Sequence, residues 1–402
     1  MLSKSLQETE VRTEPGSNGI WTPALSHSFG TDMPDEAGHP SYVDNERFFF
    51  KHDRNDLQLK FLSDWKKVEE SMCTPTSVCA IYFPSSLELQ FDKELEARLA
   101  QDLRAWPFFD LFSPSLAQLG IHWCRFCSAQ FHLSYDRIIL LQHHLTWIFL
   151  MDEVSERLPL YNLHATAGKV YLDNLKSIMR DGPIEDMTQF KGSCPDKLIQ
   201  TALSAQRIFA EDLMPLKRRL LSPCHLQACI STFDAYLDYQ YEEGHRFCAE
   251  QPSQEILKTR GHTVGSFLPL VLCMTSAQAE LYRTDDPYLL HISLCTAFFN
   301  DMIGLYKDLD SLEIQDDGSV YLNLVRASIR EQGFSEEDAL RFFAQRVNHF
   351  SRYFEFFTSS YPHEFQQFYL GALRYMFSMY DFHLVGTLGK VHCRYGWKQS
   401  HT

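Results

Sequence analysis

The sequence predicts an all-α protein, and two observations support this fold class. From about residue 75 onward, apolar residues recur at spacings of three and four along most of the chain, which is typical of helices. Strand patterns are scarce, and SVCAIYF at residues 77–83 is the only good strand candidate. The chain has 402 residues, of which 45% are hydrophobic and 14% aromatic, so it can bury a large core.

The elements follow in order along the chain. Residues 1–45 are rich in Gly, Pro, Ser, Asp and Glu, and we expect a flexible arm there. Residues 46–74 read as a charged extension that is helical over most of its length, and residues 75–402 as one helical domain. Clusters of turn residues, such as RDGPIED at 180–186, separate the helical segments of that domain. The predicted helices are 94–106, 134–154, 196–220, 225–249, 264–283, 288–310, 335–358 and 364–388.

Composition excludes several classes of protein. The net charge of −15, from 37 basic and 52 acidic residues, argues against a nucleic-acid partner. No segment reaches the roughly 18 uninterrupted apolar residues of a membrane span, and the first residues lack the apolar core of a secretory signal. Eleven irregularly spaced cysteines indicate reduced core thiols, so we expect a cytoplasmic protein with no membrane partner.

A first candidate site is WIFLMDEVSE, residues 147–156. Asp152 and Glu153 follow a long apolar helical segment, and Glu156 shares the helix face of Asp152 one turn later. Negative charge is unfavourable near a helix C-terminus unless a cation compensates it. The pattern therefore indicates a metal site, with a helix end entering water as the alternative.

A second candidate is FFNDMIGLYKDL, residues 298–309. Asn300, Gly304 and Asp308 are spaced by four residues, so a helix places them on one stripe. Amide and carboxylate oxygens are hard ligands that suit Mg²⁺. The alternative is an ordinary amphipathic helix whose charged residues face solvent.

Two further stretches could bind an anion. In KTRGHTVGSFLPL, residues 258–270, Arg260 precedes a glycine-containing break and an apolar run. In CRYGW, Arg394 and Tyr395 offer a forked donor and a hydroxyl that suit phosphate. Taken singly, the Arg260 stretch favours an ordinary loop arginine between two helices, and the pair of Arg394 and Tyr395 indicates no function.

Taken together and in this order, the four stretches resemble the class I terpene synthases, the microbial single-domain cyclases of linear prenyl diphosphates. The family's aspartate-rich motif resembles residues 152–156, and its second metal motif resembles residues 300–308. Its pyrophosphate-sensing arginine and helix break resemble Arg260 with residues 263–265, and its terminal R-Y pair resembles residues 394–395. The resemblance covers roughly residues 75–397.

The resemblance implies a helical bundle around a central apolar cavity, and a cluster of three Mg²⁺ ions, with Mn²⁺ as an alternative. The implied metal ligands are Asp152, Glu156, Asn300 and Asp308. The implied catalytic residues are Asp152, Arg260, Asn300 and Asp308. The implied diphosphate ligands are Arg260, Lys307, Arg394 and Tyr395. Periodicity places Phe149 toward the substrate cavity, one turn before Asp152, and Trp147 in the core.

Two residues depart from the family pattern, and the first is Glu153, which replaces the usual second Asp of the aspartate-rich motif. Gly304 stands where the family has a Ser or Thr that binds a metal. Because Mg²⁺ retains water readily, we expect a water molecule in place of that ligand.

The expected activity is that of a terpene cyclase, a carbon–oxygen lyase. It would ionise a linear prenyl diphosphate, C15 farnesyl diphosphate being favoured, and cyclise it to a sesquiterpene with release of diphosphate. A diterpene cyclase acting on C20 geranylgeranyl diphosphate, or an enzyme for the C10 substrate, stays open. A chain-elongating prenyltransferase is disfavoured because the second motif is not aspartate-rich, and an inactive helical homologue gains some weight from Gly304. A homodimer is left open.

Overall fold

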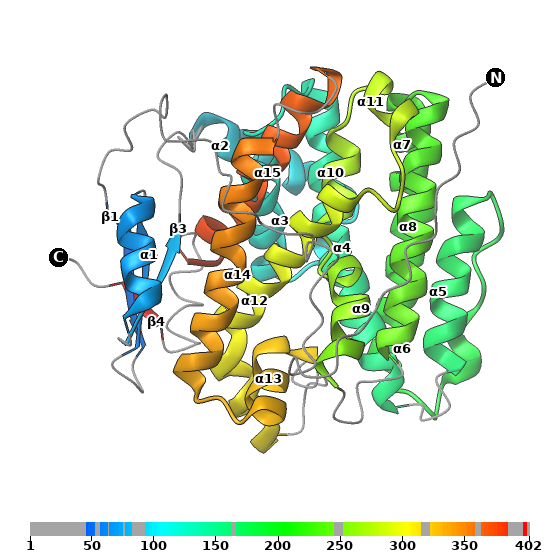
Figure 1. Ribbon diagram of the computed structural model, residues 1–402. Coiled ribbons are helices and arrows are strands. Elements are labelled where there is room, and N and C mark those ends of the chain that lie inside the picture. The colour runs from blue at the N-terminus through cyan, green and yellow to red at the C-terminus, as the bar shows by residue number, and fades with distance from the viewer. Residues whose placement is uncertain are drawn as a thin grey trace, which may run out of the picture. The chain divides into compact units, whose positions relative to one another are not determined.

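The computed structural model describes residues 46–52, 57–62, 64–74, 77–82, 93–161, 166–244, 252–314, 322–357, 363–384 and 397–399. Most of them are helical, which confirms the predicted class (Figure 1). The longer helices are α2 (Lys93–Ala105), α3 (Pro114–Ser128), α4 (Tyr135–Tyr161), α5 (Thr166–Met179), α6 (Asp196–Ile208), α8 (Pro223–Gly244), α9 (Ser253–Thr263), α12 (Pro287–Ile314), α14 (Glu336–Phe357) and α15 (His363–Leu384). Shorter ones are α1 (Trp65–Cys73), α7 (Met214–Leu220), α10 (Phe267–Cys273), α11 (Ser276–Leu281) and α13 (Leu324–Gln332).

Each predicted helical segment contains helix, but two are divided. The segment 196–220 consists of α6, a π-helical turn at Phe209–Leu213, and α7. The segment 264–283 holds two short helices, α10 and α11, with Thr275 capping the second through its side chain. Among the described helices, α3, α5, α9 and α13 were not predicted. In α5 the buried residues Tyr171, Leu175 and Ile178 recur at spacings of three and four, so the helical period is present in the sequence although this helix was not predicted.

The helical extension predicted from residue 46 is wrong over its first part. Residues 46–62 hold two strands, β1 (Glu46–His52) and β2 (Gln58–Leu62), and only α1 is helical. Along β2, Leu59 and Phe61 are buried while Gln58 and Lys60 are half-buried, an alternation with the period of a strand. In a short charged segment, this alternation is easily mistaken for an amphipathic helix.

These strands belong to a four-stranded sheet in the order β3-β2-β1-β4. β3 (Val78–Tyr82) is the predicted strand, and it pairs in parallel with β2; β4 (Trp397–Gln399) pairs antiparallel with β1. The sheet therefore crosses the expected boundary at residue 74 and joins both ends of the described chain. β3 packs against α14, and α1 packs against β3 (Figure 1). The predicted arm, residues 1–45, lies outside the described residues.

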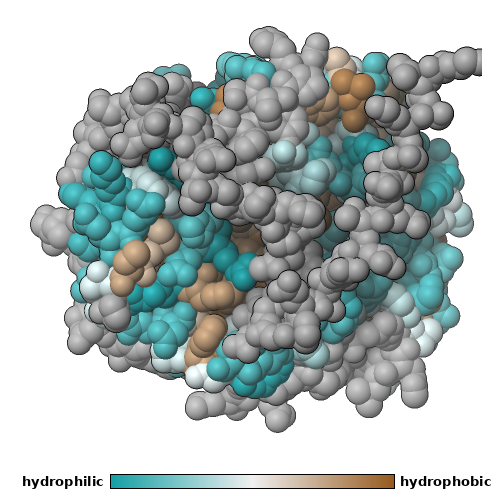
Figure 2. Space-filling view, viewed as in Figure 1, coloured by the Kyte–Doolittle hydropathy of each residue, from teal (hydrophilic) through white to brown (hydrophobic). Residues whose placement is uncertain are grey.

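The apolar residues collect in one large core around α4, which packs against α3, α5, α6, α8 and α10. The stretch Pro287–Leu305 of α12 is long and apolar enough to cross a membrane, but 72% of it is buried inside the protein, as expected of a core helix. The described surface visible in Figure 2 is mostly hydrophilic, with small separate apolar areas. Among the described residues, the exposed large apolar side chains are Leu111, Ile184 and Leu281.

Candidate active site

Asp152 lies inside α4, because this helix continues to Tyr161 instead of ending near the carboxylate as expected. Its Oδ1 accepts a hydrogen bond from the Tyr236 hydroxyl at 2.9 Å and another from Gln240 Nε2 at 3.1 Å. Burial raises the pKa of the Asp152 carboxyl to about 6, although the hydrogen bond from Tyr236 and the charge of Arg260 oppose the shift. A desolvated carboxylate of this kind is a natural ligand for a cation.

Arg260 lies in the last turn of α9 and forms a buried ion pair with Asp301 of α12. The guanidinium Nη2 donates to Asp301 Oδ1 at 2.7 Å, and the Asp301 side chain is 1% exposed. Asp301 Oδ2 accepts from the backbone N–H of Leu324 at 3.0 Å, and the Asn323 side chain donates to the Asp301 carbonyl at 2.9 Å. One aspartate thus connects α9, α12 and the N-terminus of α13.

A second buried carboxylate, Glu243 of α8, holds the same end of α9. Its Oε1 accepts hydrogen bonds from the hydroxyls of Thr259, at 3.1 Å, and Thr263, at 2.6 Å. Burial raises the pKa of Glu243, while Arg260 and the two threonines act in the opposite direction. The guanidinium of Arg260 is therefore close enough to influence both Glu243 and Asp152.

The helix break after Arg260 is present and depends on glycine. Gly265 has φ of 78°, a left-handed conformation that other residues adopt only with strain. It separates α9 from the fully buried helix α10. Within α9, a Cβ at Gly261 would lie 2.9 Å from the Leu294 side chain of α12, so a larger residue there would require Leu294 to move.

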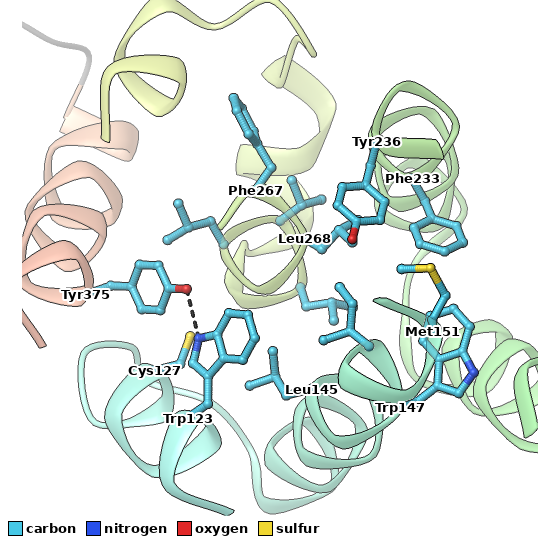
Figure 3. Packing of buried hydrophobic residues seen from close by; sticks show 14 of the residues in the cluster. Trp123, Cys127, Leu145, Trp147, Met151, Phe233, Tyr236, Phe267, Leu268 and Tyr375 are labelled. Carbon is cyan, nitrogen blue, oxygen red and sulfur yellow. Dashed lines mark hydrogen bonds between the residues drawn. The ribbon is translucent and has the colours of Figure 1, made fainter. Parts of the chain in front are cut away.

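The apolar interior beside these groups is lined from five helices. In Figure 3, Trp123 of α3, Leu145 of α4, Tyr236 of α8, Phe267 of α10 and Tyr375 of α15 converge on one region. The indole N–H of Trp123 donates to the Tyr375 hydroxyl at 2.8 Å. A small, partly open pocket lies between α8 and the α9–α10 break, lined in part by Tyr236 and Phe267.

The two aromatic residues before Asp152 differ in burial. Phe149 is half-buried and packs on Trp123, with ring centroids 5.2 Å apart. Trp147 is fully buried, donates to the Ala205 carbonyl at 2.8 Å and stacks on Phe209. Trp147 is therefore a core residue, whereas Phe149 contacts an aromatic ring that borders the apolar interior.

The second metal motif lies on the continuous helix α12. Asn300 and Gly304 are half-buried. The Asn300 amide nitrogen donates to Asp301 Oδ1 at 3.5 Å, so the amide oxygen of Asn300 takes no part in that contact. The side chains of Lys307 and Asp308 lie outside the described residues, as do Arg394 and Tyr395. Glu156 is half-buried on α4, one turn after Asp152.

Among the residues that the structure describes, no three His, Cys, Asp or Glu side chains form a ready metal cluster. The side chains of Glu153 and Asp308 lie outside the described residues. The donors that are described nevertheless fit a hard divalent ion, because Asp152 offers Oδ2 outside its two hydrogen bonds and Asn300 offers an amide oxygen. Mg²⁺ prefers such oxygens and completes its octahedron with water.

Sequence reading missed four residues of this site: Tyr236, Gln240, Glu243 and Asp301. Asp301 is part of the second metal motif but has no role in the prediction drawn from it. The other three lie at spacings of four and three in YLDYQYEEG, residues 236–244, which marks a polar stripe on one face of a helix. That spacing is visible in the sequence, but their partners on α4 and α9 are not.

Comparison with known proteins agrees with this geometry. No family model matches the chain. The chain is 48% identical over 358 residues, 89% of its length and 92% of the relative's, to a (+)-bicyclogermacrene synthase, TS4, of Penicillium expansum. Its fold resembles 2-methylisoborneol synthase from Streptomyces coelicolor A3(2), with a TM-score of 0.56 at 14% identity over 75% of this chain and 92% of that one. It also resembles a point variant of cucumene synthase, with a TM-score of 0.50 at 14% identity over 72% and 95%.

The chain belongs to the class I terpene synthases, because it has their helical fold and is 48% identical to one terpene synthase over 89% of its length. It is a terpene synthase, a carbon–oxygen lyase. The Streptomyces structure has also been determined with Mg²⁺ and 2-fluoroneryl diphosphate, a prenyl diphosphate analogue.

Proposed function

We propose that the protein ionises farnesyl diphosphate and cyclises it to a bicyclic sesquiterpene of the bicyclogermacrene type, with release of diphosphate. The observation that carries this proposal is the 48% identity to a (+)-bicyclogermacrene synthase along nearly the whole chain. The cluster of Asp152, Arg260 and Asp301 supports it, because it offers a metal carboxylate and a guanidinium beside the same apolar interior.

In this proposal Asp152 and Glu156 of α4 hold the metal together with Asn300 and Asp308 of α12. Three Mg²⁺ ions, replaceable by Mn²⁺, would supply Lewis acidity that neutralises the charge growing on the diphosphate. Because Gly304 has no side chain, a water molecule would take the place of the hydroxyl ligand there.

Arg260, Lys307, Arg394 and Tyr395 bind the diphosphate oxygens. Arg260 is suited to this task because its guanidinium has several donors in a rigid fork, and the bond to Asp301 uses its Nη2. Asp301, Glu243 and the glycine break keep that fork at the end of α9.

The apolar interior shapes the chain and excludes water from the carbocations. Trp123, Phe149 and Phe267 provide aromatic faces that stabilise cations through their quadrupoles. The Trp123–Tyr375 hydrogen bond satisfies two polar groups, so neither competes as a nucleophile or base without breaking it. Since the nine described cysteines are all free, we also propose a cytoplasmic location.

The test is incubation of the purified protein with C10, C15 or C20 diphosphate and Mg²⁺, followed by mass spectrometry of the volatile products. We expect a cyclic sesquiterpene from farnesyl diphosphate only, and none when EDTA is present. Cyclic products from the C20 substrate alone would replace this proposal with a diterpene cyclase. Longer prenyl diphosphates formed after addition of isopentenyl diphosphate would indicate a chain-elongating transferase.

A further inference from the structure

Helix α8 carries a buried polar stripe that faces the candidate site. Tyr236, Gln240 and Glu243 are 3%, 4% and 2% exposed, and their spacing places them on one helix face. Buried polar groups need partners, and these side chains find them on two other helices. Tyr236 and Gln240 bond to Asp152 of α4, whereas Glu243 bonds to threonines of α9.

Tyr236, Gln240 and Asp152 each contact the other two through their polar groups. Gln240 Nε2 lies 2.8 Å from the Tyr236 hydroxyl oxygen, and both groups donate to the same oxygen, Asp152 Oδ1. Three mutual contacts over one helical turn hold the carboxylate in a single orientation. The other oxygen, Oδ2, takes no part in these bonds and stays available for another ligand.

The chemistry of the two donors explains why they are Tyr and Gln instead of Lys or Arg. A cationic donor would neutralise Asp152 and compete with a metal ion. Neutral donors stabilise the ionised carboxylate against its desolvation without cancelling its charge. A carboxylate that serves only as a core group would be better matched by a cation, as Asp301 is by Arg260.

We propose that Tyr236 and Gln240 are positioning residues that hold Asp152 Oδ1 so that Oδ2 faces a divalent cation. This inference rests on the proposed metal-binding role of Asp152. Outer-shell partners of ligating carboxylates typically change metal affinity by about 10- to 100-fold when they are removed. The prediction therefore concerns metal affinity first and turnover only as a consequence.

The experiment titrates Mg²⁺ into the full-length protein by calorimetry in the presence of inorganic pyrophosphate, without substrate. Tyr236→Phe and Gln240→Met each remove one donor and keep the side-chain volume. Tyr239→Phe is the matched control, since it removes a hydroxyl from the same helix where the ring stacks on His262 instead of contacting Asp152. Asp152→Asn removes the charge of the ligand itself.

We expect Tyr236→Phe and Gln240→Met to weaken Mg²⁺ binding by at least about tenfold, with Tyr239→Phe unchanged and Asp152→Asn without measurable binding. In activity assays, high Mg²⁺ should restore much of the kcat of the two donor variants. If both bind Mg²⁺ like the wild type while Asp152→Asn does not, the positioning role is wrong and the proposed function stands. If Asp152→Asn binds normally, the metal role of Asp152 fails, and this inference fails with it. Should one donor variant not fold, the other decides.

Discussion

Arg260, in the last turn of α9, donates a hydrogen bond to Asp301 of α12 across 2.7 Å, and the aspartate is buried almost completely. The pair ties the helix that ends at the glycine break to the helix that carries the second metal motif. Burying an ion pair is favourable only when both partners stay matched, so removing one should be costly. The contact therefore combines a structural role with the proposed diphosphate role of Arg260.

These two roles can be separated. Arg260→Ala leaves Asp301 as an unpaired buried charge and should lower the free energy of unfolding by about 3 kcal/mol, with roughly a hundredfold loss of kcat/KM. Adding Asp301→Asn should recover most of the stability and none of the activity. Urea denaturation and steady-state kinetics measure both. A double variant that regained wild-type turnover would show that Arg260 does not bind the diphosphate.

Asp152→Asn should lower the activity and raise the stability of the metal-free protein. Burial raises the carboxyl pKa from 3.8 to about 6, so the ionised group destabilises the metal-free fold by about 3 kcal/mol above pH 6. Between about pH 4 and 6 the folded state binds more protons than the unfolded state. The contribution of Asp152 to the free energy of unfolding therefore falls as pH rises. The variant should thus have a higher Tm than the metal-free wild type at pH 7.5 and an equal one near pH 4, with turnover reduced at least about a hundredfold.

The control for this comparison is the wild type measured with Mg²⁺ and pyrophosphate, which should regain the lost stability because a cation compensates the carboxylate. An Asp152→Asn protein within about threefold of wild-type turnover would move the metal site elsewhere.

Lys217→Met should stabilise the protein near neutral pH. Lys217 of α7 is 4% exposed, and its ammonium lies 5.2 Å from the ring centroid of Phe209 and 5.7 Å from that of Phe233. Burial lowers its pKa from 10.5 to about 8. That shift corresponds to about 3 kcal/mol of destabilisation, part of which the two aromatic faces offset.

Between about pH 8 and 10.5 the unfolded state binds more protons than the folded state. The contribution of Lys217 to the free energy of unfolding therefore rises with pH. The gain from Lys217→Met, about 1–3 kcal/mol at pH 7, should shrink by pH 10. Chemical denaturation at the two pH values measures it, with Lys169→Met, an exposed lysine, as the control. A methionine variant less stable than wild type at pH 7 would mean that the ammonium makes a net stabilising contact.

Gly304→Ser should keep activity. The position is half-buried on α12, and a serine hydroxyl can take the place of the proposed water between Asn300 and Asp308. Gly304→Val should lose activity, because a branched apolar group displaces the water and offers no ligand. Mg²⁺ titrations of turnover compare the two variants. Equal tolerance of Val and Ser would show that Gly304 does not face the metals.

Truncations distinguish the arm from the sheet. Removing residues 1–45 should leave turnover and Tm unchanged, because that segment has no apolar periodicity and no motif. Removing residues 1–62 also deletes β1 and β2, including the fully buried Leu59 and Phe61, and takes away the pairing partners of β3 and β4. The shorter chain should unfold at a clearly lower temperature in calorimetry. Loss of activity in a folded protein lacking only residues 1–45 would show that the arm contributes to the site.

The sequence by itself determined the fold class, and it predicted two metal motifs and a sensing arginine. Helical periodicity and motif spacing are local properties, so they can be read without knowing which helices touch. The N–D pair at Asn300 and Asp301, the break at Gly265 and the strand at 77–83 were all visible in this way.

The tertiary structure alone decided which side chains satisfy one another. Tyr236, Gln240 and Glu243 are ordinary polar residues of a helix until α4 and α9 pack against them. The ion pair of Arg260 with Asp301 joins residues 41 positions apart, and β1 pairs with β4 across most of the chain. Such contacts depend on how helices and strands pack, which local spacing in the sequence does not specify. Buried polar groups need hydrogen-bond partners, and in this protein those partners come from segments far away in the sequence.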